Sequence, residues 1–443
     1  MKISRYNKIL NTEDNKKIAF NSMSCALAEV DESFFDIYNN IDKLVYEDLD
    51  AKTKDLVDNM LEGGYIIQDS SDELKMIKYK HLTSKFNSNT LGLTIAPTLD
   101  CNFACPYCYE TPKKGFMSEE VQNSIIDMIE KRVKKVNAIS VSWYGGEPLL
   151  GKDIVLSLSD RIVNICNENN IEYSAFMITN GFLLNEELID KLKKLKVTGY
   201  QITIDGPPRI HNERRRLRGE KRDTFNKLIE NIKILKAKNL DVNIRVNVDS
   251  TNIEYIDELL DILKENELND LIFHFGHVKT DYSDVCNSIK ATCLNDREYA
   301  DFDFECRKKL LDKGFTNESM EYYPSLKSNY CGADCVSSYV IDAEGYMYKC
   351  WTDVGKEEYS IGNVISFGEN GQDEKSWMNN INYLLWSPFE FKECRECWLL
   401  PICMGGCPGN GMKNDNKPKC GKWKYTIEKS LISKYKSCNK ECK

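Results

Sequence analysis

Six short runs of hydrophobic and β-branched residues alternate with helical patterns between about residues 90 and 280. The runs are Leu93–Leu99, Ala138–Trp143, Tyr173–Thr179, Gly199–Ile204, Val242–Val248 and Leu271–Phe275. Amphipathic stretches such as Glu119–Lys135 and Arg222–Lys238 lie between most of them. Continuous apolar strands separated by helices are typical of parallel βα units. The pattern therefore predicts an α/β fold, either a barrel or a doubly wound sheet.

Polar or glycine-rich motifs follow directly after several of these strands. They are Cys101–Cys108, Gly145-Gly146-Glu147-Pro148, Asn180-Gly181 and Asp205-Gly206. In a parallel barrel the carboxyl ends of the strands share one face, where catalytic groups gather. We therefore expect these motifs to lie together and to form the functional site.

The first 80 or so residues have a different pattern and predict a small module. Two possible strands, Lys2–Leu10 and Lys17–Val30, precede helical stretches at Glu32–Ile41 and Ala51–Glu62. Gly63-Gly64 ends the second helix, and an apolar strand follows at Tyr65–Gln68. This order is compatible with a winged helix-turn-helix, a fold that reads DNA in many proteins.

The charge of this module argues against DNA binding. Residues 1–80 carry 11 basic and 16 acidic side chains, a net charge of −5, which opposes contact with phosphates. Binding of an extended peptide along a strand edge is the better interpretation.

Composition narrows the class of the whole protein. The 443 residues are 42% hydrophobic and 29% charged, with a formal net charge of −9, which disfavours a general nucleic-acid binder. No apolar run is long enough for a membrane span, and the first residues lack the apolar core of a secretory signal. We therefore expect a cytoplasmic protein with no membrane or nucleic-acid partner.

Cysteine is the unusual residue. There are 18 cysteines, with three in residues 101–108 and ten between Cys331 and Cys442, but only four histidines. Clustered cysteines in a reducing cytosol favour metal binding over disulfides, and sulfur-rich ligand sets favour iron–sulfur clusters or zinc. From about Tyr322 onward regular periodicity fades, and such a segment needs metal or disulfide bonds to stay compact.

The first cysteine group has the spacing Cys-x3-Cys-x2-Cys, formed by Cys101, Cys105 and Cys108, with no fourth cysteine nearby. Three thiolates can hold three irons of a [4Fe–4S] cluster and leave the fourth iron open. A zinc site completed from elsewhere, or unligated thiols, are the alternatives, although zinc ligands usually come in pairs. The spacing, with Tyr107 before the last cysteine, resembles the signature of the radical SAM superfamily.

The resemblance implies a partial (β/α)6 barrel that binds S-adenosylmethionine (SAM) and cleaves it to methionine and a 5′-deoxyadenosyl radical. Gly145-Gly146-Glu147-Pro148 is similar to the family's GGEP motif, which meets the amino group of SAM. Thr203-Ile204-Asp205-Gly206, followed by His211 and Arg215, is similar to the pattern around its fourth strand. The SAM-binding residues that the resemblance implies are Tyr107, Gly145, Gly146, Glu147, Asn180, Thr203 and Arg215.

The family pattern assigns Thr203 to the ribose region and Arg215 to the SAM carboxylate, since arginine pairs with carboxylates in a bidentate way. A solvated basic loop, or contact with an acidic peptide, is the alternative for Arg214-Arg215-Arg216 and Arg218.

The cysteines of the C-terminal region resemble a SPASM domain, which in its full form holds two auxiliary [4Fe–4S] clusters. By family pattern the first would be bound by Cys331, Cys335, Cys350 and Cys407. The second would be bound by Cys394, Cys397, Cys403 and Cys420. Cys331 is the weakest assignment, because its x3 spacing to Cys335 is shorter than the x5 of sulfatase-maturing relatives, and without it one iron stays open to a substrate thiolate. A pair of zinc ribbons is the alternative.

Three [4Fe–4S] clusters leave seven cysteines. We expect core or surface thiols at Cys25, Cys166, Cys286, Cys293 and Cys306. Cys438 and Cys442 form a Cys-x3-Cys pair with no assigned role. We expect three domains: a module similar to a RiPP recognition element at 1–85, the radical SAM core at 86–310 and an irregular SPASM domain at 322–443.

Together these resemblances imply a maturase of a ribosomally made precursor peptide. The N-terminal module would hold the leader, a flavodoxin or ferredoxin would supply electrons, and the expected product is a Cys-to-carbon thioether. Peptide epimerisation and carbon–carbon crosslinking stay open. Formylglycine formation is a further alternative, but sulfatase-maturing relatives carry an aspartate base directly after the cysteine matching Cys350, where this chain has Trp351. A zinc-stabilised binding protein is the alternative outside enzymes. The sequence names no catalytic base and no oligomeric state.

Overall fold

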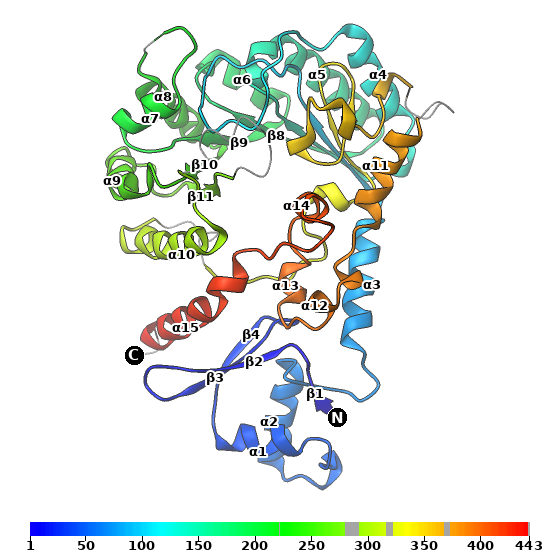
Figure 1. The fold of residues 1–443 in the computed structure, drawn as a ribbon, viewed down its shortest axis with the longest axis vertical. Coiled ribbons are helices and arrows are strands. Elements are labelled where there is room, and N and C mark those ends of the chain that lie inside the picture. The colour runs from blue at the N-terminus through cyan, green and yellow to red at the C-terminus, as the bar shows by residue number, and fades with distance from the viewer. Residues whose placement is uncertain (221, 280–291, 316–321, 367–372, 442–443) are drawn as a thin grey trace. The chain divides into compact units, whose positions relative to one another are not determined.

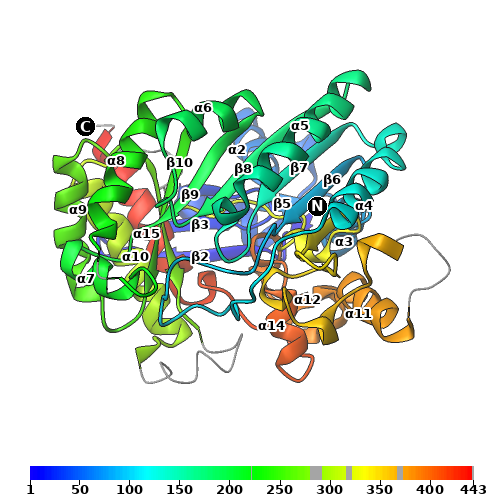
Figure 2. The same cartoon turned by 90° about the horizontal axis from the view of Figure 1, so that it is seen from above.

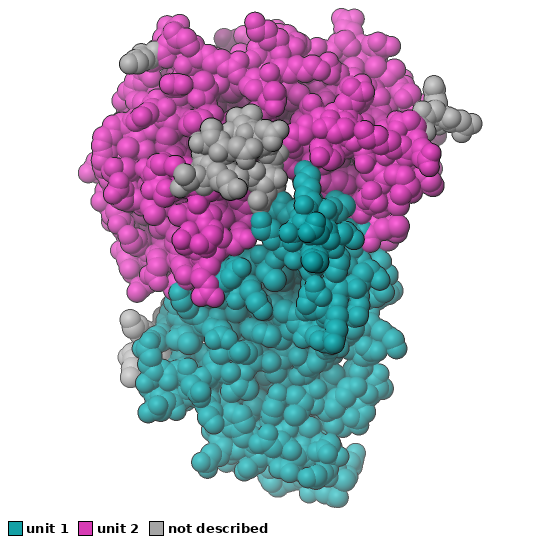
Figure 3. Space-filling view, viewed as in Figure 1, with its two compact units in different colours: residues 1–85, 322–331, 386–443 teal, residues 86–321, 332–385 magenta. Residues whose placement is uncertain are grey.

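A computed structural model describes residues 1–220, 222–279, 292–315, 322–366 and 373–441. The chain divides into two compact units, coloured in Figure 3. Unit 1 comprises residues 1–85, 322–331 and 386–443, and unit 2 comprises residues 86–321 and 332–385. The three predicted domain boundaries remain predictions beside this grouping. Over the described ranges, every helix is too short or too polar to span a lipid bilayer.

Unit 2 is built on an eight-stranded sheet with the order β11-β10-β9-β8-β7-β6-β12-β13 (Figure 1). Strands β6 to β11 run parallel, each beside the next along the chain. Their bounds are Thr90–Ile95, Ala138–Trp143, Glu172–Thr179, Val197–Thr203, Asp241–Val248 and Ile272–His277. Strand β12 (Ser338–Ile341) adds in parallel to β6, and β13 (Met347–Tyr348) pairs with β12 antiparallel. The predicted six parallel strands are confirmed.

Helices of unit 2 lie along the outer side of these strands, as Figure 2 shows for α5, α6 and α8. Strands and helices share one large apolar core that includes Trp143, Tyr200 and Phe273, each 2% exposed or less. The helices of unit 2 are α4 (Glu119–Glu130), α5 (Lys152–Glu168), α6 (Glu186–Lys194), α7 (Pro208–Arg214), α8 (Thr224–Ala237), α9 (Ile256–Glu265), α10 (Asp296–Asp312) and α11 (Glu374–Leu385). Crossover helices after each strand bring all six carboxyl ends to the same edge.

The turn between β12 and β13 contains a buried carboxylate, Asp342, which is 1% exposed. Its Oδ1 accepts bonds from the amides of Glu344 (2.9 Å) and Tyr346 (3.0 Å), and its Oδ2 accepts one from the Tyr348 hydroxyl (2.9 Å). Burial raises the pKa of Asp342 from 3.8 to about 6. The folded state therefore binds this proton more tightly than the unfolded chain does.

We expect Asp342→Asn to flatten the pH dependence of stability. In the native protein, the favourable contribution of the protonated Asp342 is present below pH 4 and is lost as pH rises to about 6, a change of about 3 kcal/mol. Asparagine keeps the oxygen that accepts both amides and carries no charge. The difference in unfolding free energy between variant and native protein should therefore grow between pH 4 and pH 7. The exposed Asp127→Asn is the control, and an equal slope in both variants would contradict the assignment.

Unit 1 combines the N-terminal module with C-terminal helices. Its three-stranded antiparallel sheet has the order β2-β3-β4, with bounds Asn7–Asn11, Lys17–Asn21 and Ala26–Val30. Strand β1 (Lys2–Ile3) pairs with β5 (Ile66–Ile67). The helices of unit 1 are α1 (Glu32–Asn40), α2 (Ala51–Glu62), α3 (Glu73–Lys85), α12 (Lys392–Arg395), α13 (Leu400–Cys403), α14 (Pro408–Lys413) and α15 (Trp423–Glu441).

The two faces of this sheet bury different partners. Ala19 and Val30 lie in a cluster with residues of α1 and α2, whereas Ile18 and Phe20 lie in a cluster with Ile402 of α13 and apolar residues of α15. Alternate residues of a strand point to opposite faces, which explains how one strand joins both clusters. The sheet is thus covered on both sides.

Some predicted element bounds were wrong. The predicted strand Lys17–Val30 is a hairpin, because Asn21 Oδ1 accepts the amides of Met23 (2.8 Å) and Ser24 (3.0 Å) and Cys25 has a φ of 59°. Likewise Lys2–Leu10 is divided between β1 and β2. The predicted Leu93–Leu99 ends at Ile95 as β6, two residues before Pro97, whose ring cannot donate to a ladder. The predicted helix Glu119–Lys135 ends at Glu130.

Candidate functional site

The three-cysteine motif lies in the loop after β6, at the carboxyl edge of the parallel strands. Short local bonds fold this loop. The Cys101 amide donates to Asp100 Oδ1 (2.9 Å), the Phe103 amide to Cys101 Sγ (3.4 Å) and the Cys108 amide to Cys105 O (3.3 Å). All three cysteines are partly buried. The loop thus gathers three sulfur atoms at one place, as the sequence predicted.

Burial raises the pKa of each thiol in this loop, to about 12 for Cys101. The other cysteines add to the shift at Cys101 and Cys108, whereas the Arg215 guanidinium acts against it at Cys101 and Cys105. Thiolates are the ligands of iron, so a site of this kind needs the positive charge of its metal to keep the thiols deprotonated. The donor set therefore fits an iron–sulfur cluster.

The glycine pair after β7 allows the cysteine loop to approach closely. An added Cβ at Gly146 would lie 2.6 Å from the Asp100 carbonyl carbon and 2.7 Å from Leu99 O. Gly145 has a φ of 113°, a conformation that favours glycine, and its Cβ would meet the backbone of Thr98. The Glu147 amide donates to Asp100 O (2.9 Å). The motif therefore supports the loop by direct backbone contact.

Glu147 is fully buried, and its carboxylate binds neighbouring parts of the chain. It accepts bonds from the Leu149 amide (3.0 Å), the Thr179 hydroxyl (2.7 Å) and the Asn180 amide (2.7 Å). Burial raises its pKa, and these bonds act in the opposite direction. Glu147 thus joins the end of β7 to the end of β8. Its predicted contact with the SAM amino group stays a prediction.

Asn180 connects the third strand to the cysteine loop. Its Nδ2 donates to Asn102 Oδ1 (2.7 Å) and lies 4.0 Å from Cys101 Sγ. Thr203, by contrast, is buried in β9, where it is the register partner of Arg245. Of these two predicted SAM-binding residues, Asn180 therefore directly follows β8 and Thr203 is the last residue of β9.

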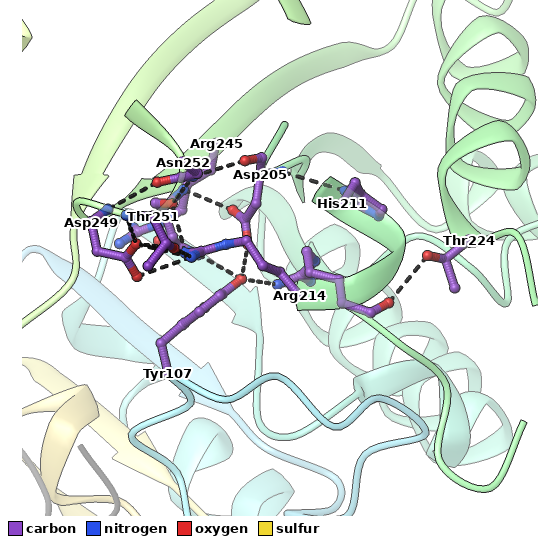
Figure 4. A network of polar contacts seen from close by, with 11 residues as sticks. Tyr107, Asp205, His211, Arg214, Thr224, Arg245, Asp249, Thr251 and Asn252 are labelled. Carbon is purple, nitrogen blue, oxygen red and sulfur yellow. Dashed lines mark hydrogen bonds and ion pairs between the residues drawn. The ribbon is translucent and has the colours of Figure 1, made fainter. Parts of the chain in front are cut away.

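Arg215 contacts Tyr107, the residue before the last cysteine of the loop. Arg215 is 8% exposed, and its Nη1 donates to the Tyr107 hydroxyl (2.8 Å). Figure 4 shows Tyr107 within a network of polar contacts. The Tyr107 hydroxyl in turn donates to the buried Asp205 carboxylate after β9. Arg215 Nε is buried and has no partner among the described residues. A buried guanidinium with an open donor suits a carboxylate ligand, as predicted for SAM.

Arg214 lies in the same network but pairs within the protein. Its Nη1 is 3.0 Å from both oxygens of Asp249, and its Nε is 3.8 Å from Asp205 Oδ2. The alternative of a solvated basic loop is therefore wrong for Arg214 and Arg215, which are both buried. Arg218 is exposed and pairs with Asp100 (2.9 Å).

His211 orients the turn after β9. It accepts a bond from the Asp205 amide on Nδ1 (3.3 Å), and burial holds its pKa well below the usual range, so the ring is neutral. Asp205 belongs to one of the strand-end motifs that the sequence predicted for the site, whereas Asp249 and Asn247 were not predicted. Their position directly after β9, or at and after the end of β10, was the available signal, since polar residues at parallel strand ends face the site.

We expect Tyr107→Phe to lower the free energy of unfolding by about 1–3 kcal/mol. The hydroxyl bridges Asp205 and Arg215, both buried, and its removal leaves two buried charged groups short of a partner. Denaturant unfolding of the anaerobic protein measures the change. Tyr79→Phe is the control, because Tyr79 is 72% exposed. Equal effects of the two variants would argue against the network.

Sequence reasoning also missed a group next to the last cysteine. The hydroxyls of Tyr109 and Tyr144 share a short hydrogen bond, and burial raises the pKa of the neighbouring Glu110 to about 7. Glu110 Oε2 is buried and has no partner among the described residues. Trp351 packs on Tyr144, with ring centroids 5.0 Å apart. Polar groups thus continue from the cysteine loop toward the segment after Cys350.

Four cysteines of unit 1 gather around the loop between α12 and α15. The pKa of Cys394 is raised to about 12, mainly by burial. The nearby charges of Cys403, Cys420 and Cys397 contribute to the same rise. An isolated bridge between Gly406 and Lys419 brings Cys420 beside the loop. The predicted second auxiliary ligand set is thus close in space, and its cluster remains a prediction.

The other predicted auxiliary set draws on both units, because Cys331 and Cys407 belong to unit 1 and Cys335 and Cys350 to unit 2. It stays a prediction. In unit 2, Cys350 Sγ lies 3.1 Å from the Thr352 hydroxyl. Burial raises the pKa of Tyr383, and the charge of Cys350 adds to this shift.

The remaining cysteines have different environments. Cys166 and Cys306 are buried, Cys25 and Cys293 are half-buried, and Cys438 is exposed. Cys286 and Cys442 lie outside the described residues.

Across the described ranges, no group of three or more His, Cys, Asp or Glu side chains could hold a single metal ion. The ligands of a [4Fe–4S] cluster need not form such a group, because each thiolate binds a different iron.

The Radical SAM superfamily model matches residues 95–265. The chain is 26% identical over 381 residues to a cysteine-type anaerobic sulfatase-maturating enzyme of Clostridium novyi (strain NT), covering 77% of this chain and 96% of that protein. It is 24% identical over 267 residues to the radical SAM cyclopropyl synthase TigE of Paramaledivibacter caminithermalis, covering 54% of this chain and 55% of that protein.

Two solved structures have similar folds. One is native anSMEcpe with bound AdoMet and Cp18Cys peptide, with a TM-score of 0.61 and 21% identity over 79% of this chain and 99% of that one. The other is Streptococcus suis SuiB bound to precursor peptide SuiA, with a TM-score of 0.52 and 16% identity over 95% of this chain and 98% of that one. These similarities confirm the α/β partial barrel.

Proposed function

We propose that this radical SAM enzyme, whose radical SAM domain spans residues 95–265, modifies a ribosomally made precursor peptide. The domain implies a [4Fe–4S] cluster and SAM, which together supply a 5′-deoxyadenosyl radical that abstracts hydrogen. Cys101, Cys105 and Cys108 would hold the cluster. Arg215, with its open buried donor, would bind the SAM carboxylate.

The observation that carries the peptide assignment is a groove in the N-terminal module. It has a volume of about 630 Å³ and is lined by β4, α1 and α2. Within the described part of the chain, no strand pairs with the outer edge of β4. An open strand edge beside a groove is suited to an extended peptide that adds as a further strand. The names of the relatives, which include sulfatase-maturating enzymes and a SuiB complex with precursor peptide SuiA, support a peptide substrate.

The product we propose is a thioether between a cysteine sulfur and a carbon of the same peptide. The 5′-deoxyadenosyl radical would take one hydrogen atom from the carbon. The thiol would then lose its proton as the carbon–sulfur bond forms. The C-terminal cysteines would hold an auxiliary cluster, which would accept the surplus electron, since iron–sulfur potentials span a wide range. The peptide thus loses two hydrogen atoms per crosslink. A flavodoxin or ferredoxin would supply the electron that begins each turnover.

Formylglycine formation is the second candidate, favoured by the sulfatase-maturating relatives. Trp351 argues against this candidate, because it occupies the position directly after Cys350 where the sequence comparison above expects an aspartate base in those enzymes. Asp353 is buried and accepts a bond from the Tyr383 hydroxyl (2.7 Å), so this carboxylate is already engaged. Epimerisation and carbon–carbon crosslinking stay open.

Mass spectrometry of a precursor peptide co-produced with the enzyme tests the proposal. A thioether removes two hydrogen atoms and makes one cysteine resistant to alkylation. A carbon–carbon crosslink removes two hydrogens but leaves every cysteine alkylated, and epimerisation leaves the mass unchanged in water while adding deuterium in D₂O. A peptide of unaltered mass, sequence and deuterium content would contradict the proposed function. Iron and sulfide analysis tests the cofactor count, for which three clusters require about 11–12 irons per chain.

A further inference from the structure

The groove of the N-terminal module is acidic at its rim. Its lining includes five carboxylates, Glu29, Asp31, Asp36, Asp50 and Asp55, and a single ammonium, that of Lys52. The ratio of acidic to basic residues in this lining is far higher than in the whole chain, which has 69 acidic and 60 basic residues. The imbalance therefore belongs to the groove and not to the general composition.

Three of these carboxylates already have partners. Glu29 pairs with Lys16 (2.9 Å), while Asp31 accepts the Phe34 amide (3.0 Å) and Asp50 accepts the amides of Lys52 (2.9 Å) and Thr53 (3.1 Å) as helix caps. Asp55 accepts a hydrogen bond from the uncharged amide of Asn59 (3.4 Å).

Asp36 on α1 and Asp55 on α2 are both exposed, and within the described part of the chain neither takes part in an ion pair. Two exposed, unneutralised carboxylates on the two helices of one groove favour a positively charged occupant.

The floor of the same groove is apolar. Phe34 and Ile37 of α1 and Met60 of α2 line it and belong to the core cluster of the module. Side chains of an added strand alternate between two faces, so every second one would face α1, α2 and this floor. A lysine or arginine among these groove-facing residues can keep its stem on the apolar floor and its charge in water, within reach of the rim.

We propose that the groove takes an extended leader segment whose groove-facing side chains include both apolar residues and lysine or arginine. This inference rests on the proposed function and adds the chemistry of the peptide to it. The segment pairs with the outer edge of β4, its apolar side chains enter the groove between α1 and α2, and its cations lie near Asp36 and Asp55. An acidic leader would meet repulsion from the same carboxylates.

Fluorescence anisotropy of the full, anaerobically prepared protein tests the inference with two labelled peptides of about nine residues, the length of a long strand. One repeats Lys-Lys-Val-Val, so that each face of the strand carries both residue types, and the other repeats Glu-Glu-Val-Val. We expect the native protein to bind the Lys peptide about tenfold more tightly, with a preference that shrinks as salt is added. The double variant Asp36→Lys/Asp55→Lys should lose or invert this preference.

The matched control is Asp42→Lys/Glu62→Lys, which changes the net charge of the same module equally at two exposed positions outside the groove lining. It should keep the native preference within about twofold. A native protein without preference, or an equal loss in both double variants, would overturn the inference.

Reductive SAM cleavage without peptide verifies that each variant is folded and loaded. If co-produced precursor is modified but the Lys peptide is not preferred, the charge assignment fails and the proposed function stands. If the Lys peptide is preferred but no co-produced precursor is changed, the proposed function fails.

Discussion

We expect the replacement of Cys105 by alanine to abolish SAM cleavage. The three thiols of the 101–108 loop are gathered by one short turn, and two of them cannot hold three irons of a cluster. We expect the iron content to fall by about four per chain, the content of one [4Fe–4S] cluster. Formation of 5′-deoxyadenosine with dithionite and SAM should fall by at least about a thousandfold, a loss within the range that enzymes contribute.

Cys166→Ala is the matched control for this experiment. Cys166 is buried in α5 in the same unit, and its thiol belongs to the apolar core. This variant should keep its iron and its SAM cleavage. A Cys105 variant with full iron content and unchanged 5′-deoxyadenosine formation would remove the basis of the enzymatic assignment.

Gly146→Ala has the second largest expected effect. The added methyl group would lie 2.6 Å from the Asp100 carbonyl carbon and 2.7 Å from Leu99 O, both backbone atoms that lead into the cysteine loop. The backbone has to move, and we expect a loss of about 3 kcal/mol in the free energy of unfolding. A displacement of the loop by about 1 Å should lower 5′-deoxyadenosine formation about a hundredfold.

Gly92→Ala provides the comparison for Gly146→Ala. Gly92 lies in β6 of the same sheet, and an added Cβ would meet Ser338 Oγ at 3.5 Å, an ordinary contact distance. The two variants thus introduce the same atom in a tight and in an open environment. Denaturant unfolding and the electron paramagnetic resonance signal of the cluster distinguish them, and equal behaviour would argue against the close approach.

The fold of the barrel could be predicted because each strand has a local hydrophobic pattern that shows which of its residues are buried. The runs Ala138–Trp143 and Val242–Val248 carry apolar residues at alternate positions and are bounded by polar turns, and the structure has strands at 138–143 and 241–248. The N-terminal hairpin, by contrast, was not predicted. The turn at Asn21 depends on side-chain acceptance of two amides, which an apolar pattern does not reveal.

The candidate site was predicted where chemistry is tied to spacing in the chain. Cys101, Cys105 and Cys108 lie within a single loop, and Gly145 to Glu147 follow one strand. The partners of Tyr107 were not predictable, because Asp205 and Arg215 lie about a hundred residues away and reach it only through the parallel order of the strands. Nor could the sequence tell that Arg214 is bound to Asp249 and Arg215 retains an open donor.

The sequence by itself determined the spacing of the cysteines and the alternation of strands and helices, because both depend on short intervals along the chain and on local hydrophobic periodicity. Only the tertiary structure decided which distant groups share a site. It brought residues 386–443 together with the N-terminal sheet in one unit, and it placed Asp36 and Asp55 beside a common groove, where neither forms an ion pair with a described residue. The physical reason is that burial and charge pairing depend on contacts between residues far apart in the chain, and these contacts form only when the whole chain folds.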